Sequence, residues 1–452
     1  MILSLHCPLD TICRLRMPYV TKDNKVITFD QLDIRYNRPD KVLQAIGSVD
    51  TSLIKSYKKT YDKRIKKLGV DTASFRSGYN VPEADFSNRA AIALDQNKQQ
   101  LTLQVKGKDE SYNLDRFNVW VNENPIFGMR GISLKNKKRR EIDTTIVIKL
   151  SEGNNIIETS VTNINGAESY KMPLIINFKP EKPSSIKLFF VGIGIDQFSQ
   201  SQNNLQWSVK DIRDQAKALK IKYGDEIIID TLFNQQVTIA NVIALKEKLK
   251  ASEVNDKVII AYSGHGLLSK DYDYFLSTFA VNFDKPEQNG LAYDELENLL
   301  DNIPARQKLM LIDACHSGEL DKDEIIKINN AESTLAANKT QGGKGVKVIN
   351  TGSKKGDMKT SLELMQQLFV NVGRSTGATI ISAAAGTQFA LEKNDLKNGV
   401  FSYSILEYMQ ANPHATVTDL KKYVNKRVAE LTAGLQVPTT RNETKNLNWK
   451  IW

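Results

Sequence analysis

The chain of 452 residues has little cysteine, little histidine and no long hydrophobic run. Its three cysteines, Cys7, Cys13 and Cys315, are too few for a disulfide framework, so we expect a reducing compartment, the cytoplasm. No stretch of about 18 or more apolar residues occurs, so we predict no membrane-spanning helix. The N-terminus also lacks the basic start and the full apolar core of a secretory signal peptide. The composition, with 41% apolar and 25% charged residues, is that of an ordinary globular protein.

The net charge of +10 is concentrated in three basic clusters, at residues 55–67, 135–140 and 339–359. Such clusters are found in nucleic-acid-binding proteins, but more often they are solvated faces or loops. Few aromatic residues are interleaved with them here. We therefore expect neither nucleic acid nor a membrane to be the main partner.

The hydrophobic pattern divides the chain into regions. Residues 1–86 include a stretch of helical periodicity at 51–68 and are too few to bury a core alone, so we predict a helical docking region. Residues 87–179 alternate with a period of two between turn signals, which predicts an all-β, immunoglobulin-like sandwich. Residues 180–185 contain prolines and serines and form a predicted linker.

The last region, residues 186–452, alternates short apolar runs with stretches of helical spacing. Predicted strands cover 186–195, 226–229, 258–262, 308–312 and 378–384, and predicted helices cover 205–222, 238–249, 291–300, 361–372, 401–410 and 418–431. This alternation predicts an α/β fold, with a mostly parallel sheet and helices on both of its faces.

Two short motifs each follow an apolar run of this region directly. They are Tyr262-Ser263-Gly264-His265-Gly266 and Asp313-Ala314-Cys315-His316-Ser317-Gly318. In an open α/β sheet, functional residues lie just past the carboxyl ends of the strands. We therefore expect the histidine of the first motif and the cysteine of the second to meet at one edge of the sheet.

A cysteine and a histidine in contact can perform nucleophilic catalysis. The imidazole takes the proton of the thiol, and later gives a proton to the amine leaving group. Of the four histidines, His6 and His414 lie far away in sequence and His316 adjoins the cysteine, so His265 is the candidate base for Cys315.

Backbone N–H groups beside the pair can stabilise the negative oxygen that develops during attack on a carbonyl. We predict that Gly266 and Cys315 supply these donors. The alternative is that the cysteine is inert packing and that the histidine is a satisfied polar group. Either motif alone would be weak evidence, but together they predict catalysis.

The two motifs resemble those of the caspase and metacaspase cysteine peptidases, particularly the prokaryotic caspase-like proteins, in the clan that also contains clostripain and gingipain. His265 and Cys315 are separated by fifty residues, which is about the separation of the caspase His and Cys. The resemblance covers residues 186–410 and implies a caspase–haemoglobinase fold, a Cys–His dyad and cleavage of peptide bonds. In the metacaspase and clostripain-like branches an Asp two residues before the cysteine selects Arg or Lys, a role that falls on Asp313 here. The alternative is that Asp313 only caps a backbone turn.

The resemblance also assigns roles to the later part of the chain. Residues 319–360 would form the loop between the two subunit portions of the family. A basic-specific enzyme could cut itself in this loop, and the candidate sites are Lys339, Lys344, Lys354 and Lys355. An uncut flexible loop is the alternative. Glu392 would add to the substrate pocket.

We expect no metal or other cofactor. Some metacaspases need calcium, so calcium is the alternative. The acidic residues near the motifs form no tight ligand pattern; these residues are Asp271, Asp273, Asp321 and Asp323. The sequence thus predicts a cysteine endopeptidase acting on proteins or peptides, with an activating or docking partner bound through residues 1–179. A catalytically silent scaffold or signalling adaptor and a nucleic-acid-associated protein are the alternatives.

Overall fold

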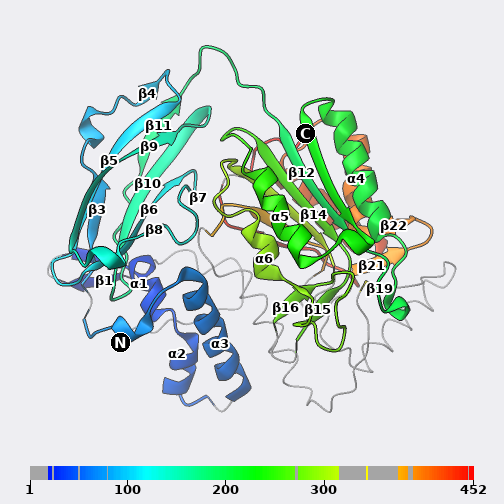
Figure 1. Ribbon diagram of the computed structural model, residues 1–452, viewed down its shortest axis with the longest axis horizontal. Coiled ribbons are helices and arrows are strands. Elements are labelled where there is room, and N and C mark those ends of the chain that lie inside the picture. The colour runs from blue at the N-terminus through cyan, green and yellow to red at the C-terminus, as the bar shows by residue number, and fades with distance from the viewer. Residues whose placement is uncertain are drawn as a thin grey trace. The chain divides into compact units, whose positions relative to one another are not determined.

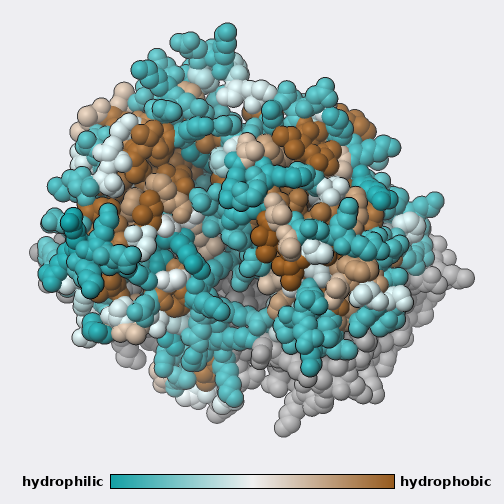
Figure 2. Space-filling model, viewed as in Figure 1, coloured by the Kyte–Doolittle hydropathy of each residue, from teal (hydrophilic) through white to brown (hydrophobic). Residues whose placement is uncertain are grey.

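The computed structural model describes residues 19–22, 25–48, 51–78, 80–269, 273–314, 343–344, 375–384, 390–445 and 447–452. The chain forms two compact units, Met1–Pro183 and Ser184–Trp452 (Figure 1). The division falls inside the predicted linker at residues 180–185. On the face shown in Figure 2, hydrophilic and hydrophobic side chains are intermixed on both units.

The first unit contains a β-sandwich. Its strands are β3 (Glu83–Phe86), β4 (Asp95–Gln96), β5 (Gln100–Lys108), β6 (Leu114–Val121), β7 (Asn124–Pro125), β8 (Ile132–Ser133), β9 (Glu141–Lys149), β10 (Gly153–Asn163) and β11 (Leu174–Phe178). One sheet has the order β4-β11-β10-β6-β7, with β8 also paired to β6, and the other has the order β3-β5-β9. Residues that alternate along the strands of the two sheets face a shared core; Leu103 of β5 and Val119 of β6 are examples. The all-β prediction is confirmed, and the immunoglobulin-like topology stays a prediction.

The sandwich begins earlier than the predicted boundary at residue 87. Strand β3 pairs with β5, with Phe86 opposite Val105, and the Phe86 side chain is buried in the sandwich core. The strand is short and only one of its four residues is fully buried, so its hydrophobic pattern is weak. Its pairing with β5, a strand outside this short stretch, is what defines it.

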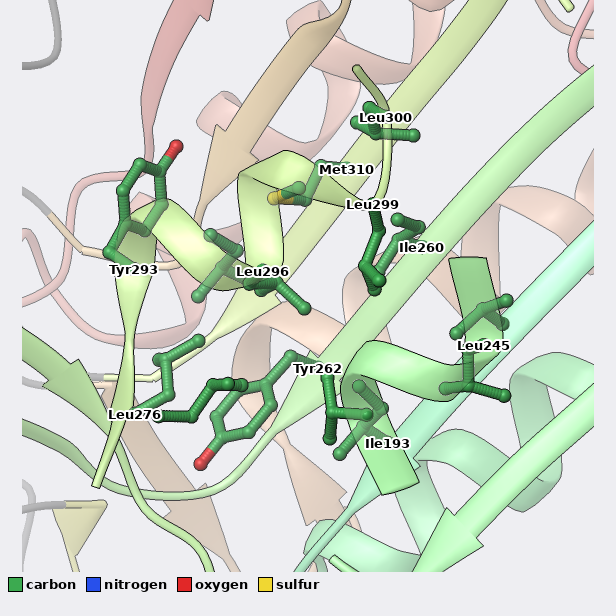
Figure 3. Packing of buried hydrophobic residues seen from close by; sticks show 14 of the residues in the cluster. Ile193, Leu245, Ile260, Tyr262, Leu276, Tyr293, Leu296, Leu299, Leu300 and Met310 are labelled. Carbon is green, nitrogen blue, oxygen red and sulfur yellow. The ribbon is translucent and has the colours of Figure 1, made fainter. Parts of the chain in front are cut away.

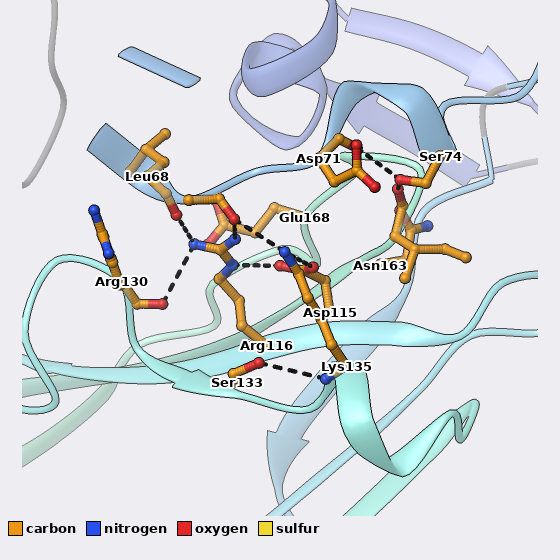
Figure 4. A network of polar contacts seen from close by, with 12 residues as sticks. Leu68, Asp71, Ser74, Asp115, Arg116, Arg130, Ser133, Lys135, Asn163 and Glu168 are labelled. Carbon is orange, nitrogen blue, oxygen red and sulfur yellow. Dashed lines mark hydrogen bonds and ion pairs between the residues drawn. The ribbon is translucent and has the colours of Figure 1, made fainter. Parts of the chain in front are cut away.

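The elements before the sandwich are β1 (Tyr19–Lys22), β2 (Lys25–Thr28), α1 (Phe29–Tyr36), α2 (Pro39–Ala45) and α3 (Thr51–Leu68). Helix α3 has the predicted bounds. Side chains of the sandwich bind the carbonyls at its end: the Arg116 guanidinium donates to Leu68 O and Gly69 O, and Lys135 Nζ lies 3.0 Å from Gly69 O (Figure 4). The last carbonyls of a helix lack partners within it and carry partial negative charge, so these cations stabilise the end of α3.

The second unit is built on one sheet with the strand order β13-β12-β14-β18-β20-β23. These strands are β12 (Leu188–Gly194), β13 (Ile227–Phe233), β14 (Lys257–Ser263), β18 (Gln307–Asp313), β20 (Thr379–Ser382) and β23 (Thr439–Asn442). All neighbours are parallel except β20 and β23, which are antiparallel. The predicted, mostly parallel sheet is confirmed.

Helices cover both faces of this sheet, as predicted. They are α4 (Ser208–Tyr223), α5 (Ile239–Leu249), α6 (Tyr293–Asn298), α9 (Val400–Ala411) and α10 (Val417–Leu431). Side chains alternate along β12: Val191 and Ile193 face the core under α5 and α6, part of which Figure 3 shows. Leu188 and Phe190 face the core under α4, α9 and α10. A strand buried on both faces requires the continuous apolar run that the sequence shows.

Two small antiparallel sheets flank the large one. The first has the order β15-β16-β17, with β15 at Gly266–Leu268, β16 at Tyr274–Leu276 and β17 at Leu291–Ala292. The second joins β19 (Gly343–Lys344), β21 (Ala390–Lys393) and β22 (Asn398–Gly399) in that order. Across the described ranges of the chain, no helix combines the length and the apolar character that a membrane crossing needs.

Candidate active site

Strands β14 and β18 place the two sequence motifs side by side. Their parallel register pairs Ser263 with Asp313, the last residue of each strand. In the sequence, His265 and Cys315 are each two residues beyond this pair. Gly264 N also donates to Asp313 O at 3.2 Å, which joins the ends of the two strands. Cys315 itself lies outside the described residues. The register brings the end of β18, which directly precedes this motif's cysteine in sequence, beside the end of β14, which directly precedes the histidine.

The His265 side chain is held in a buried aromatic setting, with 6% of the residue exposed. Its ring centroid lies 5.2 Å from that of Phe198 and 5.3 Å from that of Phe283. Nε2 lies 2.8 Å from the backbone carbonyl oxygen of Asn203. Because a carbonyl only accepts hydrogen bonds, Nε2 carries the hydrogen of the neutral ring, and Nδ1 is the nitrogen that can take a proton.

The turn between β14 and β15 requires glycine at position 264. A Cβ added there would lie 2.6 Å from Ile195 Cγ2 and 2.6 Å from the Tyr262 hydroxyl oxygen, which is far inside van der Waals contact. Gly266 begins β15 and pairs with Leu276. Its role as an oxyanion donor stays a prediction, as does the same role for Cys315, which lies beyond the described residues.

Asp313 is buried at the end of β18, with 2% of the residue exposed. Its Oδ2 accepts from the backbone N of Ser402 at 3.2 Å and from the Ser402 hydroxyl at 2.6 Å. Ser402 belongs to the first turn of α9, where backbone N–H groups have no partner within the helix. Asp313 thus ties β18 to α9, and its role in substrate selection stays a prediction.

A second buried carboxylate, which the sequence analysis missed, lies beside the first. Asp211 on α4 is fully buried; its Oδ2 accepts from the Ser263 hydroxyl at 2.9 Å, and its Oδ1 accepts from Asn398 Nδ2 at 3.0 Å and Gly399 N at 2.9 Å. Ser263 is the register partner of Asp313, so both carboxylates approach the same strand ends. The sequence feature that could have revealed Asp211 is an acidic residue on the apolar face of a predicted helix.

Glu392 lies at the beginning of α4. Its two carboxylate oxygens accept from the backbone N of Gln206 and of Trp207, each at 3.1 Å. An acceptor with negative charge at this place satisfies free N–H groups and complements the helix dipole. These contacts are those of a helix cap, and the predicted contribution of Glu392 to the substrate pocket stays a prediction.

The remaining predicted residues can be described only in part. Lys339, Lys354, Lys355 and Asp271 lie outside the described residues. Lys344 is described in its backbone alone, as part of β19, where it pairs with Ala390. No group of three or more His, Cys, Asp or Glu side chains able to hold a metal ion occurs among the residues described.

A histidine and two carboxylates gathered at the carboxyl ends of adjacent parallel strands occupy the place where α/β proteins put their functional sites. The family model described as "Caspase domain" matches residues 191–447, which is more than half of the chain. The chain therefore belongs to the caspase family, and it has the caspase-like fold that the motifs predicted.

The chain is also similar to curated metacaspases. It is 26% identical over 270 residues to Metacaspase-1 of Eremothecium gossypii, covering 50% of this chain and 58% of that protein. It is 25% identical over 273 residues to Metacaspase-1 of Schizosaccharomyces pombe, covering 52% and 62%. The chain thus spans less than two thirds of these relatives. A crystal structure of Caspase-1 from Spodoptera frugiperda matches 58% of this chain and 90% of its own, with 12% identity and a TM-score of 0.36.

Proposed function

We propose that the chain is a cysteine endopeptidase in which Cys315 is the nucleophile and His265 is the general base and acid. The observation that carries this proposal is the β14–β18 register, which starts both segments from one paired position, Ser263 and Asp313. Membership of the caspase family and the buried histidine support it.

The chemistry follows from the orientation of the histidine. The Asn203 carbonyl holds the hydrogen on Nε2, so Nδ1 accepts the proton of the thiol. The thiolate then attacks the carbonyl carbon of the scissile peptide bond, and backbone N–H groups at the turn stabilise the oxyanion. The imidazolium gives its proton to the leaving amine, and water hydrolyses the resulting thioester with the histidine acting again as base.

Substrate charge follows from the carboxylates. Asp211 and Asp313 are both buried beside the ends of β14 and β18, and Asp313 precedes the proposed nucleophile by two residues in the sequence. Carboxylates in a site shielded from water attract a guanidinium or ammonium group and repel an acidic one. The proposed substrates are therefore proteins or peptides cleaved after Arg or Lys, and Asp in that position is disfavoured.

Fluorogenic peptides that differ only in the residue before the cleavage point test the activity. We expect turnover with Arg or Lys there, none with Asp, and none by Cys315→Ala or His265→Ala. Absence of turnover by the wild-type chain on every peptide of such a library would favour a silent scaffold. Equal turnover by the wild type and Cys315→Ala would refute the assignment of Cys315 as the nucleophile.

The charge of the pocket has its own test in Asp313→Asn. The amide oxygen of Asn can still accept both hydrogen bonds from Ser402, so the variant removes charge and leaves the contacts. A hydrogen bond to a charged group contributes about 1.5–3 kcal/mol, so kcat/KM for an Arg peptide should fall about ten- to a hundredfold. A neutral citrulline peptide should lose little. Asp230→Asn, on strand β13 at the far edge of the sheet, is the matched control. An unchanged preference for Arg over citrulline would contradict the assignment.

We also propose that the enzyme cuts itself within residues 319–360, which carry Lys339, Lys344, Lys354 and Lys355. The basic specificity proposed above supports this, because these lysines follow the cysteine within one continuous segment. Mass spectrometry of incubated wild-type protein should find new termini after these lysines, and Cys315→Ala should remain one band. An active preparation that stays uncut would show that self-cleavage is not required.

A further inference from the structure

The main chain of His265 is held by a closed set of hydrogen bonds that the proposed mechanism does not use. His265 N donates to the Ser277 hydroxyl at 3.1 Å, and Ser277 N donates to His265 O at 2.9 Å. The Ser277 and Tyr262 hydroxyls lie 2.8 Å apart. The Tyr262 hydroxyl also lies 2.9 Å from Ser277 O and 3.2 Å from His265 O.

The direction of each hydrogen bond can be assigned. Ser277 Oγ accepts from His265 N, which leaves its own hydrogen for the Tyr262 oxygen, and Tyr262 then donates to one of the two carbonyls. Ser277 is fully buried and Tyr262 is 1% exposed, so water has no access to replace a lost partner. Figure 3 shows the Tyr262 ring within the hydrophobic cluster, with its hydroxyl at the edge.

We propose that Ser277 and Tyr262 are positioning residues that fix the direction in which the histidine presents its ring to Cys315. This inference rests on the proposed role of His265 as the base. The ring nitrogen Nε2 is held by Asn203 O, and the main chain is held by Ser277, so the residue is fixed at both ends. A displacement of about 1 Å between reacting groups can cost about a hundredfold in rate.

The two residues come from different elements. Tyr262 is on β14, within the motif, whereas Ser277 directly follows β16 and lies twelve residues after the histidine. The β15–β16 pairing, with Gly266 opposite Leu276, brings the serine back to the histidine. The small antiparallel sheet thereby helps to position the proposed catalytic histidine.

The test compares Ser277→Ala and Tyr262→Phe with the wild type on an Arg peptide. We expect kcat to fall about ten- to a hundredfold in each variant, with KM within about twofold, because Asp313 and the pocket are unchanged. The double variant should lose no more kcat than the less active of the two single variants, because the two hydroxyls act as one unit. Alkylation of Cys315 by iodoacetamide should slow in parallel, with its pH profile moved towards higher pH.

Ser252→Ala is the matched control. This buried serine also accepts from a backbone N–H, that of Ala305 at 3.2 Å, and donates to Leu249 O at 2.7 Å, but it lies before β14, at the opposite end of the sheet. It should lower the melting temperature without changing kcat. Tyr262→Phe keeps the ring in the core and so remains informative if Ser277→Ala fails to fold.

The outcomes separate this inference from the proposed function. If Ser277→Ala and Tyr262→Phe keep kcat within twofold of the wild type while His265→Ala is inactive, the histidine is the base and the positioning role is refuted. If His265→Ala turns over like the wild type, both the base assignment and the positioning role are overturned. A loss of kcat in both variants and none in Ser252→Ala supports the inference.

Discussion

Lys308 gives the second unit a pH dependence of stability whose sign and size follow from burial. The residue is near the start of β18 and is 2% exposed, and its Nζ lies 3.0 Å from Leu300 O and 2.8 Å from Thr376 O. Burial disfavours the charged ammonium and lowers the Lys308 pKa from 10.5 to about 8, although Asp301 and Glu443 act in the opposite direction.

The sign follows from counting protons. Between pH 8 and 10.5, the ordinary pKa of lysine, the unfolded chain binds the proton and the folded chain does not. The free energy of unfolding therefore rises with pH across this window. Below pH 8 both states are charged and the full penalty of about 3 kcal/mol is present. From pH 7 to about pH 9.5, Lys308 should add about 2 kcal/mol to the stability of the folded state.

Lys308→Met tests this value, because the apolar side chain fills the same space without a titrating group. Urea unfolding at pH 7 and about pH 9.5 should show the wild type gaining about 2 kcal/mol relative to the variant. Lys220→Met, at an exposed position on α4, should follow the wild type. Parallel pH dependence of the wild type and Lys308→Met would show that the buried lysine does not carry the penalty.

Two further substitutions address the buried ion pairs and the turn that carries His265. Arg441 forms ion pairs with both Glu297 and Glu443, and all three residues are buried. Arg441→Leu should lower the free energy of unfolding, measured by heat or urea, by about 3–5 kcal/mol, because two buried carboxylates lose their partner. A loss below about 1 kcal/mol would contradict this. Gly264→Ala should lower kcat about a hundredfold, because the turn that carries His265 must move to make room for the Cβ. Turnover equal to that of the wild type would show that the turn tolerates a Cβ.

The sequence predicted those elements whose residues carry their own periodic pattern. Helix α3 begins and ends at the predicted residues. The helix predicted over 238–249 is α5, and Thr238 caps it by accepting from Asn241 N at 3.1 Å. Strand β23 was missed because Thr439–Asn442 is polar and short. It is a strand only because β20 offers it an edge to pair with, and no pattern within four residues records the presence of a neighbour.

The same distinction applies to the site. His265 was found because its motif directly follows a buried strand, and Asp313 was found through the resemblance of its motif to the family. The topology then places the ends of β14 and β18 side by side. Asn203 was missed because it contributes a backbone carbonyl, which any residue possesses. Ser277 was missed because a single serine after a three-residue strand has no distinguishing pattern, and only the return of β16 beside β15 gives it a role.

The buried carboxylates also connect the parts of the second unit that lie before and after residues 319–360. Asp211 and Asp313 come from before that stretch, but their donors Asn398 and Ser402 come from after it. Strands β18 and β20 pair across the same division. A cut within 319–360 would remove none of these contacts, because each joins residues outside the stretch. The hydrogen bonds of Asp211 and Asp313 therefore depend on the folded arrangement of both parts and not on the covalent link between them, so the proposed self-cleavage is compatible with these contacts.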